Sequence, residues 1–282
     1  INIIIFHYLP MIGIVVAFKD YKIDKGILGS PWNGFKNFEF FFTSGHAWRV
    51  TRNTILLNIM FIAANTISQV FFSLMLNEIK NKFFKRINQS IMFLPYFMSW
   101  LIVSVITMGF LEADTGAINK ILMSWGLEPV NWYGTATVWP VILVILNIWK
   151  WTGYGVVIYL ATIIGFDTEY YEAATIDGAS KLQQVIHITL PLLIPTIMIL
   201  TLLSIGRIFY GDFGMIYGLV GDNAILFPTT DVIDTYVYRA LRQMSDFGMS
   251  GAVGLYQSVM SFIVVLASNQ LARKFRSDGA LF

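Results

Sequence analysis

The stretch 169–191 carries the most informative polar and small side chains in this chain. Glu169 and Glu172 would fall in the first turn of a helix, where carboxylates favour the positive end of the helix dipole. Gly178 follows Asp177 and can adopt the left-handed conformation that ends a helix. The residues therefore predict a short helix from Glu169 to Asp177, terminated by Gly178, with a second helical segment leading to the proline at the end of the stretch.

Such a helix has the chemistry of a docking element. Ala173 and Ala174 are small enough for it to lie closely against a groove of a partner protein, and Glu172 offers a carboxylate to an arginine or to backbone donors there. A helix lying on the membrane surface is the alternative. That kind of helix favours Lys and Arg on its polar face, and this one is acidic, so docking to a protein is favoured.

The spacing in this stretch resembles the EAA motif of ABC-importer permeases. The family pattern is Glu-Ala-Ala, three residues, Gly, nine residues, then Ile-x-Leu-Pro. It is matched without a gap at Glu172, Ala173, Ala174, Gly178, Ile188, Leu190 and Pro191. The resemblance implies that residues 165–190 form a cytoplasmic coupling loop. It also implies that a separate ATPase subunit docks there, on Glu172, Ala173, Ala174, Asp177, Gly178 and Ala179.

Other stretches resemble the sugar permeases of the LplB, UgpA and MalF kind. Residues 230–239 and 246–255 are similar to the approach to their last helix, and 17–21 with 34–38 to the exit from their first. The resemblance covers nearly the whole chain and implies a type I ABC-importer permease. It departs at the start, where the usual cytoplasmic lead-in is absent, and in 179–187, which holds no family-specific residue.

Composition places the chain in a membrane. Of 282 residues, 56% are hydrophobic and 13% charged, whereas a soluble domain has roughly 25% charged residues. The net charge is only +2 and the basic residues fall in short clusters, so the chain has no basic face of the kind that binds nucleic acid. The absence of cysteine excludes thiolate metal sites and cysteine nucleophiles, and the three histidines have no metal-ligand spacing, so we predict no metal site.

Six apolar stretches approach the roughly 20 residues that a helix needs to cross a bilayer. They are 1–18, 54–77, 90–111, 138–164, 191–210 and 252–272. We therefore predict an all-α integral membrane protein of about six transmembrane helices, forming a single permease domain over 1–282.

Basic residues in short connections set the orientation, because cytoplasmic loops are enriched in Lys and Arg. Clusters at 80–86 and 273–276 place the second connection and the C terminus in the cytoplasm. Six spans then place the N terminus there too, and make 211–251 an extracytoplasmic loop before the last helix. The first outward connection, 19–53, is also basic and does not support the assignment. The family resemblance implies the bacterial cytoplasmic membrane.

The chain has no ATP-binding motif of its own. A P-loop needs Gly-x-x-x-x-Gly-Lys followed by Ser or Thr, yet none of the 11 lysines precedes Ser or Thr. We predict no enzymatic activity and no cofactor in this chain, with ATP and Mg²⁺ bound by a partner. The resemblance implies a second permease of different sequence, two ATPase subunits, an extracytoplasmic solute-binding protein and surrounding lipid, but no nucleic acid. ATP would drive alternating access by rigid-body motion of packed helices.

Carbohydrate sites combine aromatic faces with amides and hydroxyls. Candidates for the substrate pathway are Tyr96, Asn147, Trp149, Lys150, Trp151, Tyr154 and Arg207. The aromatic residues can equally be packing or interface residues. A lysine inside a span marks either a pathway or a buried structural contact. If Lys150 and Arg207 face the route, an acidic oligosaccharide such as an alginate fragment is the expected cargo.

An ion-coupled secondary transporter is the alternative function. It requires carboxylates inside spans and often shows inverted repeats, but the predicted spans lack Asp and Glu except at their ends, and no repeat is visible. An intramembrane enzyme would require a metal set or a serine dyad, and neither is present as a motif. We therefore predict the transmembrane subunit of an ATP-driven carbohydrate importer.

Overall fold

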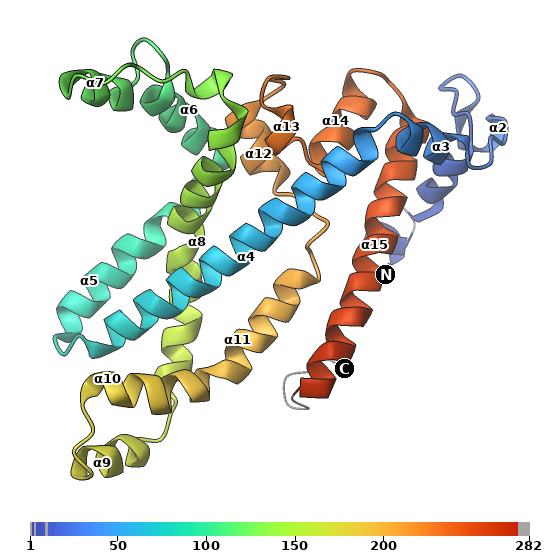
Figure 1. Ribbon diagram of the computed structural model, residues 1–282. Coiled ribbons are helices and arrows are strands. Elements are labelled where there is room, and N and C mark those ends of the chain that lie inside the picture. Colours follow the sequence, from blue (N-terminus) through green and yellow to red (C-terminus); the bar gives the residue numbers. More distant parts are fainter. Residues whose placement is uncertain (1, 3, 9–10, 276–282) are drawn as a thin grey trace. The chain divides into compact units, whose positions relative to one another are not determined.

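The computed structural model describes residues 2, 4–8 and 11–275 of the chain, and the ordered elements in them are helices (Figure 1). Within these residues the only strand-like feature is one bridge between Lys19 and Trp32. The helices long and apolar enough to cross a membrane are α4 (His46–Glu78), α8 (Trp139–Ile164), the continuous run from Lys181 to Ile205, and α15 (Phe247–Phe275). The prediction of an all-α membrane protein is confirmed.

The third predicted span, 90–111, is not one helix. Helix α5 (Lys82–Phe93) continues into the 3₁₀ turn η3 (Leu94–Phe97), Met98 is extended, and α6 (Trp100–Leu111) then begins. This pair would count as a fifth span in the described part of the chain. An uninterrupted helix was the wrong prediction here, because periodicity does not show where a helix ends inside an apolar run.

The first predicted span, 1–18, is not among the helices long enough to cross a membrane in the described part of the chain, which holds four such helices, or five with the bent pair, where six were predicted. Within 1–18, residues 1, 3, 9 and 10 lie outside the description; η1 (Ile4–Tyr8) is a π-helical turn and η2 (Ile12–Phe18) is 3₁₀. The predicted connections contain further helices. These are α2 (Gly26–Gly29), α3 (Lys36–Thr43), α7 (Ala117–Ser124), η4 (Trp132–Gly134), η5 (Ala136–Val138), α12 (Phe213–Val220), α13 (Phe227–Thr230) and α14 (Ile233–Arg242).

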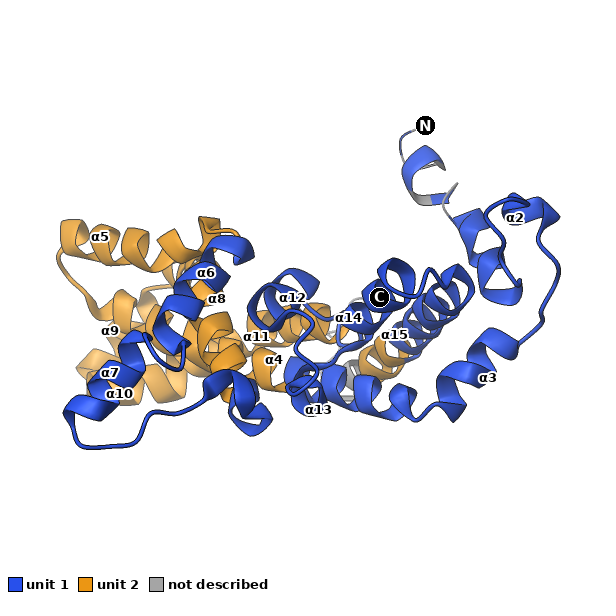
Figure 2. Cartoon of the chain, turned by 90° about the horizontal axis from the view of Figure 1, so that it is seen from above, with its two compact units in different colours: residues 1–58, 100–140, 207–263 blue, residues 59–99, 141–206, 264–282 orange. Residues whose placement is uncertain are grey.

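Backbone contacts divide the chain into two compact units, coloured separately in Figure 2. Unit 1 comprises 1–58, 100–140 and 207–263, and unit 2 comprises 59–99, 141–206 and 264–282. Helices α4, α8 and α15 each contribute residues to both units.

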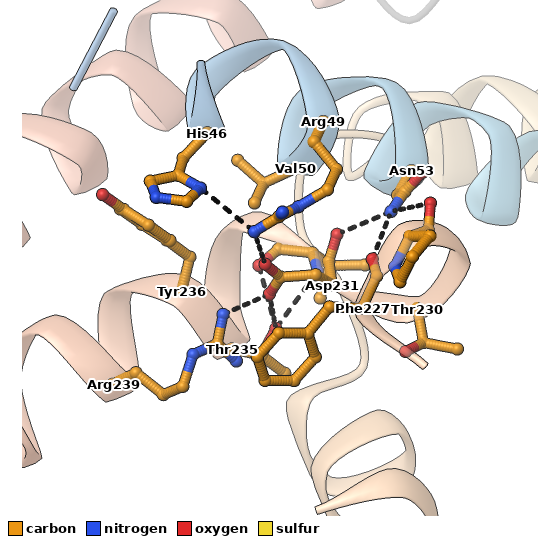
Figure 3. A network of polar contacts seen from close by, with 12 residues as sticks. His46, Arg49, Val50, Asn53, Phe227, Thr230, Asp231, Thr235, Tyr236 and Arg239 are labelled. Atoms are coloured by element: carbon orange, nitrogen blue, oxygen red, sulfur yellow. Dashed lines mark hydrogen bonds and ion pairs between the residues drawn. The ribbon is translucent and has the colours of Figure 1, made fainter. Parts of the chain in front are cut away.

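Unit 1 is organised around one buried carboxylate, Asp231, which ends α13 (Figure 3). Its side chain has no exposed surface and accepts from Arg49 of α4 at 3.0 Å and from Arg239 of α14. The Thr235 hydroxyl donates to the same carboxylate at 3.1 Å, and the Asn53 amide donates to the Asp231 carbonyl at 3.1 Å. A single acid at the end of α13 therefore joins the neighbouring α14 to α4, which lies far earlier in the sequence.

The packing of unit 2 rests on α4 and α8 approaching each other closely. A Cβ added to Gly155 would lie 2.0 Å from Cδ of Gln69. Hydrogen bonds between the two helices link Ser68 to Thr152 at 3.1 Å, Asn65 to Asn147 at 2.6 Å, and the Gln69 amide to the Trp151 carbonyl at 3.2 Å. Small residues and polar side chains hold helices together where lipid removes the hydrophobic drive for association.

Large apolar side chains nevertheless remain exposed along these helices. Ile67, Val141 and Phe262 are 70%, 61% and 64% exposed. Large exposed apolar side chains of this kind suit contact with hydrocarbon rather than water.

Replacing Asp231 by Asn should lower the thermal stability of the protein strongly. The substitution leaves two arginines without their counter-charge, and breaking a buried ion pair costs about 3–5 kcal/mol. The measurement is the unfolding midpoint of purified protein in detergent. The matched control is Asp20→Asn, whose exposed carboxylate lies 3.9 Å from Lys22 and should contribute less than about 1 kcal/mol. Equal midpoints for the two variants would contradict this assignment.

Gly153→Ala should also destabilise the protein, although alanine is the better helix former. The added Cβ would lie 2.0 Å from the Met92 carbonyl oxygen, so α5 must move, and overpacking typically costs about 1–3 kcal/mol. Gly109→Ala in α6 is the control, because no atom other than the neighbouring residues and backbone of its own helix lies within 4 Å of the place that its Cβ would take. Thermal unfolding should place Gly153→Ala below the parent and Gly109→Ala at or above it; the reverse order would refute the close α5–α8 contact.

Candidate docking loop and substrate pathway

The predicted docking helix is present as α9 (Glu169–Ile176). Gly178 has φ of +78° and ends it. The Ala179 amide donates to the Ala174 carbonyl at 2.8 Å, and the Gly178 amide to the Thr175 carbonyl at 3.1 Å. This pair of bonds is the Schellman arrangement, in which glycine takes the left-handed position without a Cβ penalty. The predicted helix and its glycine terminator are both confirmed.

The next segment is fixed by a capping box that was not predicted from the sequence. Helix α10 (Lys181–Gln184) begins after Ser180, whose amide donates to the Gln183 side chain at 2.7 Å while the Gln183 amide donates back at 3.4 Å. The Ser-x-x-Gln spacing was the available signal. A π-helical turn, η6 (Val185–Thr189), then leads into α11 (Leu190–Ile205), with a proline in its first turn.

Side-chain hydrogen bonds hold the two sides of this loop together. The Gln184 amide donates to the Thr175 hydroxyl at 2.9 Å, and Gln184 is buried. The Tyr171 and Thr189 hydroxyls lie 3.0 Å apart. Helix α9 is therefore attached to the start of a membrane span at two points, so a force on α9 would be transmitted to α11.

The surface of the loop combines a hollow, a carboxylate and exposed apolar side chains. The hollow has a volume of about 330 Å³ and is lined by Ala174, Asp177, Gly178, Ala179, Gln183, Gln184, His187 and Ile188. Glu172 and Ala173 are exposed on α9. Ile176 and Leu182, which were not among the predicted contact residues, are 87% and 69% exposed. These features offer a partner both apolar area and a charge.

Four of the predicted pathway residues share one face of α8. Asn147, Lys150, Trp151 and Tyr154 follow the spacing that places side chains on the same side of a helix. Tyr96 of η3 stacks on Tyr154 with ring centroids 5.0 Å apart and meets Trp151 edge-on at 5.5 Å. The structure therefore brings three of the predicted aromatic residues into one cluster.

The other predicted pathway residues have different surroundings. Asn147 is buried and accepts from Asn65. Trp149 points from a different face of α8 and is 44% exposed. Lys150 is 5% exposed and contacts backbone carbonyls of the segment around η3. Arg207 is exposed and belongs to unit 1, whereas the aromatic cluster belongs to unit 2.

Residues 61–277 match the family model described as binding-protein-dependent transport system inner membrane component. Protein LplB of Bacillus subtilis is 37% identical over 276 residues, covering 98% of this chain and 86% of LplB. The polygalacturonan/rhamnogalacturonan transport system permease protein YteP of the same organism is 36% identical over 279 residues, covering 99% of this chain and 86% of YteP.

A solved structure is similar over almost the full length. A crystal structure of a bacterial ABC transporter involved in the import of the acidic polysaccharide alginate contains a chain that is 33% identical. It covers 97% of this chain and 91% of that one, with a TM-score of 0.88. A second structure of a bacterial alginate ABC transporter, in complex with an alginate pentasaccharide-bound periplasmic protein, has a TM-score of 0.88 at 32% identity, covering 97% and 91%.

These matches cover the docking loop and the spans on either side of it. The chain belongs to the binding-protein-dependent transport system inner membrane component family, and is a multi-pass inner-membrane permease subunit of an ABC importer rather than an enzyme.

Proposed function

We propose that this chain carries an oligosaccharide across the membrane by alternating access, driven by a separate ATPase that docks on α9. The observation that carries the proposal is the geometry of the EAA loop. Its helix ends at a left-handed glycine, its small residues line a hollow, and hydrogen bonds attach it to α10 and η6, which lead into α11. A loop built this way can transfer the motion of a docked subunit to a membrane helix.

Docking would use two kinds of contact. Exposed Ile176 and Leu182 supply apolar area that the partner would cover. Glu172 supplies a carboxylate suited to a bidentate arginine. Ala173 and Ala174 let the partner approach the backbone, and the remaining predicted contact residues, Asp177, Gly178 and Ala179, surround the helix end.

The complete assembly in this proposal contains a second permease of different sequence, two ATPase subunits and an extracytoplasmic solute-binding protein, all acting in lipid. ATP and Mg²⁺ bind the ATPase subunits, and neither nucleic acid nor a cofactor binds this chain. The N and C termini, the 80–86 connection and the α9 loop face the cytoplasm, and 211–251 faces outward. The whole chain acts as one permease domain, since α4, α8 and α15 run through both units.

The proposed cargo is an acidic oligosaccharide of the alginate or pectin type. Among the similar proteins, the name of YteP refers to polygalacturonan and rhamnogalacturonan, and the transporter in the solved structures is described as importing alginate. The aromatic cluster of Tyr96, Trp151 and Tyr154 in unit 2 offers ring faces on which the apolar side of a sugar can stack. The other proposed pathway residues either line the route or support the residues that line it; these are Asn147, Trp149, Lys150 and Arg207.

Changing Glu172 to Ala should reduce binding-protein-stimulated ATP hydrolysis by about tenfold or more in the reconstituted transporter, because a charge-assisted contact at the docking surface is lost. Glu169→Ala is the matched control, since it removes the same charge from the first turn of the same helix at a position outside the EAA pattern. Co-purification of the ATPase subunit should fall with Glu172→Ala alone. Equal activity and equal ATPase retention for the two variants would contradict specific docking through Glu172.

If the cargo is an acidic oligosaccharide, the ATPase activity of the transporter should depend on which sugar the solute-binding protein carries. ATP hydrolysis in lipid should rise with binding protein carrying alginate or polygalacturonate fragments and should remain basal with neutral oligosaccharides of equal length. Stimulation by neutral sugars alone would refute the acidic cargo but leave the importer in place. Uptake that requires an ion gradient and no ATPase would instead support a secondary transporter.

A further inference from the structure

Lys150 is a buried residue whose ammonium donates hydrogen bonds to the backbone at a break in a membrane helix. It lies in the middle of α8 with 5% of its surface exposed. Its ammonium donates to the carbonyl oxygens of Pro95 at 3.3 Å and Tyr96 at 3.1 Å, and also to that of Met98. Three carbonyl oxygens match the three N–H donors that a lysine ammonium carries.

The three carbonyls lie where a helix stops inside the apolar region. η3 ends at Phe97 and Met98 is extended. The Pro95 carbonyl also accepts from the Met98 amide at 3.1 Å, and its second lone pair faces the ammonium. Carbonyls that follow the last turn of a helix lack a donor within it and bear partial negative charge. In a bilayer core they need a donor from the protein, because water is absent there. A cation at the C-terminal end of the helix meets both requirements.

The surface of α8 around Lys150 is shaped to receive this segment. One turn further on, Gly153 approaches the backbone so closely that a Cβ would lie 2.0 Å from the Met92 carbonyl oxygen and 2.7 Å from Cα of Phe93. The ring of Tyr154, beside it, stacks on Tyr96 of η3. The backbone at Gly153, the ring of Tyr154 and the ammonium of Lys150 therefore all contact the same short segment, residues 92–98.

We propose that Lys150 is a positioning residue that clamps the interrupted helix onto α8 and so fixes Tyr96 in the aromatic cluster. Its charge neutralises backbone carbonyls of the protein and does not select acidic over neutral cargo. The effect of Lys150 on transport rests on the proposed function. The clamp itself involves only contacts within unit 2 and does not depend on it.

Electron paramagnetic resonance can test the clamp directly, because the chain has no native cysteine. Spin labels at Phe97→Cys and Ile145→Cys would sit on η3 and α8, at side chains 70% and 58% exposed. The Lys150→Met variant should broaden the distance distribution between the labels, and Lys150→Arg should restore most of it. Thr152→Val is the matched control, since it removes a buried polar contact from α8, to Ser68, without touching the break.

Transport by the complete reconstituted importer distinguishes a lysine that positions the η3 segment from a lysine that recognises the charge of the cargo. Under the proposal, Lys150→Met reduces uptake of acidic oligosaccharides by about tenfold or more, and by the same factor for fragments with all carboxylates free and for fragments with part of them esterified. A reduction that depends on the number of free carboxylates, with an unchanged distance distribution, would overturn the proposal, and so would an unchanged distribution with unchanged uptake. If transport proves independent of ATP, the proposed function fails, whereas broadening in Lys150→Met still supports the clamp.

Discussion

The constraint on which this structure depends is that hydrocarbon offers no hydrogen bonds to a polypeptide backbone. Helices meet it along most of their length, and the difficult places are their ends. Lys150 supplies donors where η3 stops, and Asn58 does the same for another interruption, donating to the carbonyls of Ile208 and Tyr210 at 2.9 and 3.2 Å. Gln257 acts at the same interruption as Asn58, with a 2.7 Å bond to the Phe209 carbonyl. At both interruptions, polar side chains thus supply donors where the backbone departs from a helix.

The docking loop was predictable because its determinants are local. A helix with acidic residues in its first turn and a glycine after its last residue needs no tertiary information, and both α9 and the left-handed Gly178 follow. The Ser180 capping box is equally local, so its Ser-x-x-Gln spacing would have been enough to predict the start of α10. Four of the six predicted spans are present as single long helices in the described part of the chain. The break in 90–111 could not be predicted, because an apolar run has the same composition whether or not it contains a break.

The meaning of Lys150 could not be obtained from the sequence, because the carbonyls that it contacts lie 52–55 residues earlier in the chain. A lysine in a span and an aromatic group one turn away are compatible with a sugar route and with a structural clamp. The same limit applies to Asp231, whose two arginine partners come from α4 and α14. Sequence spacing identifies the members of one helix face, whereas the partners of buried charges depend on which helices meet.

The Asp231 network also sets an order of events during synthesis. Arg49 precedes Asp231 by 182 residues, so at about 5–20 residues per second a ribosome needs roughly 10–40 seconds to supply the acid after the first arginine. Unit 1 cannot complete this link before most of the chain has been made. During that interval Arg49 at the start of α4 lacks the Asp231 carboxylate, so the link between α4 and the later helices forms only after α13 and α14 have been made.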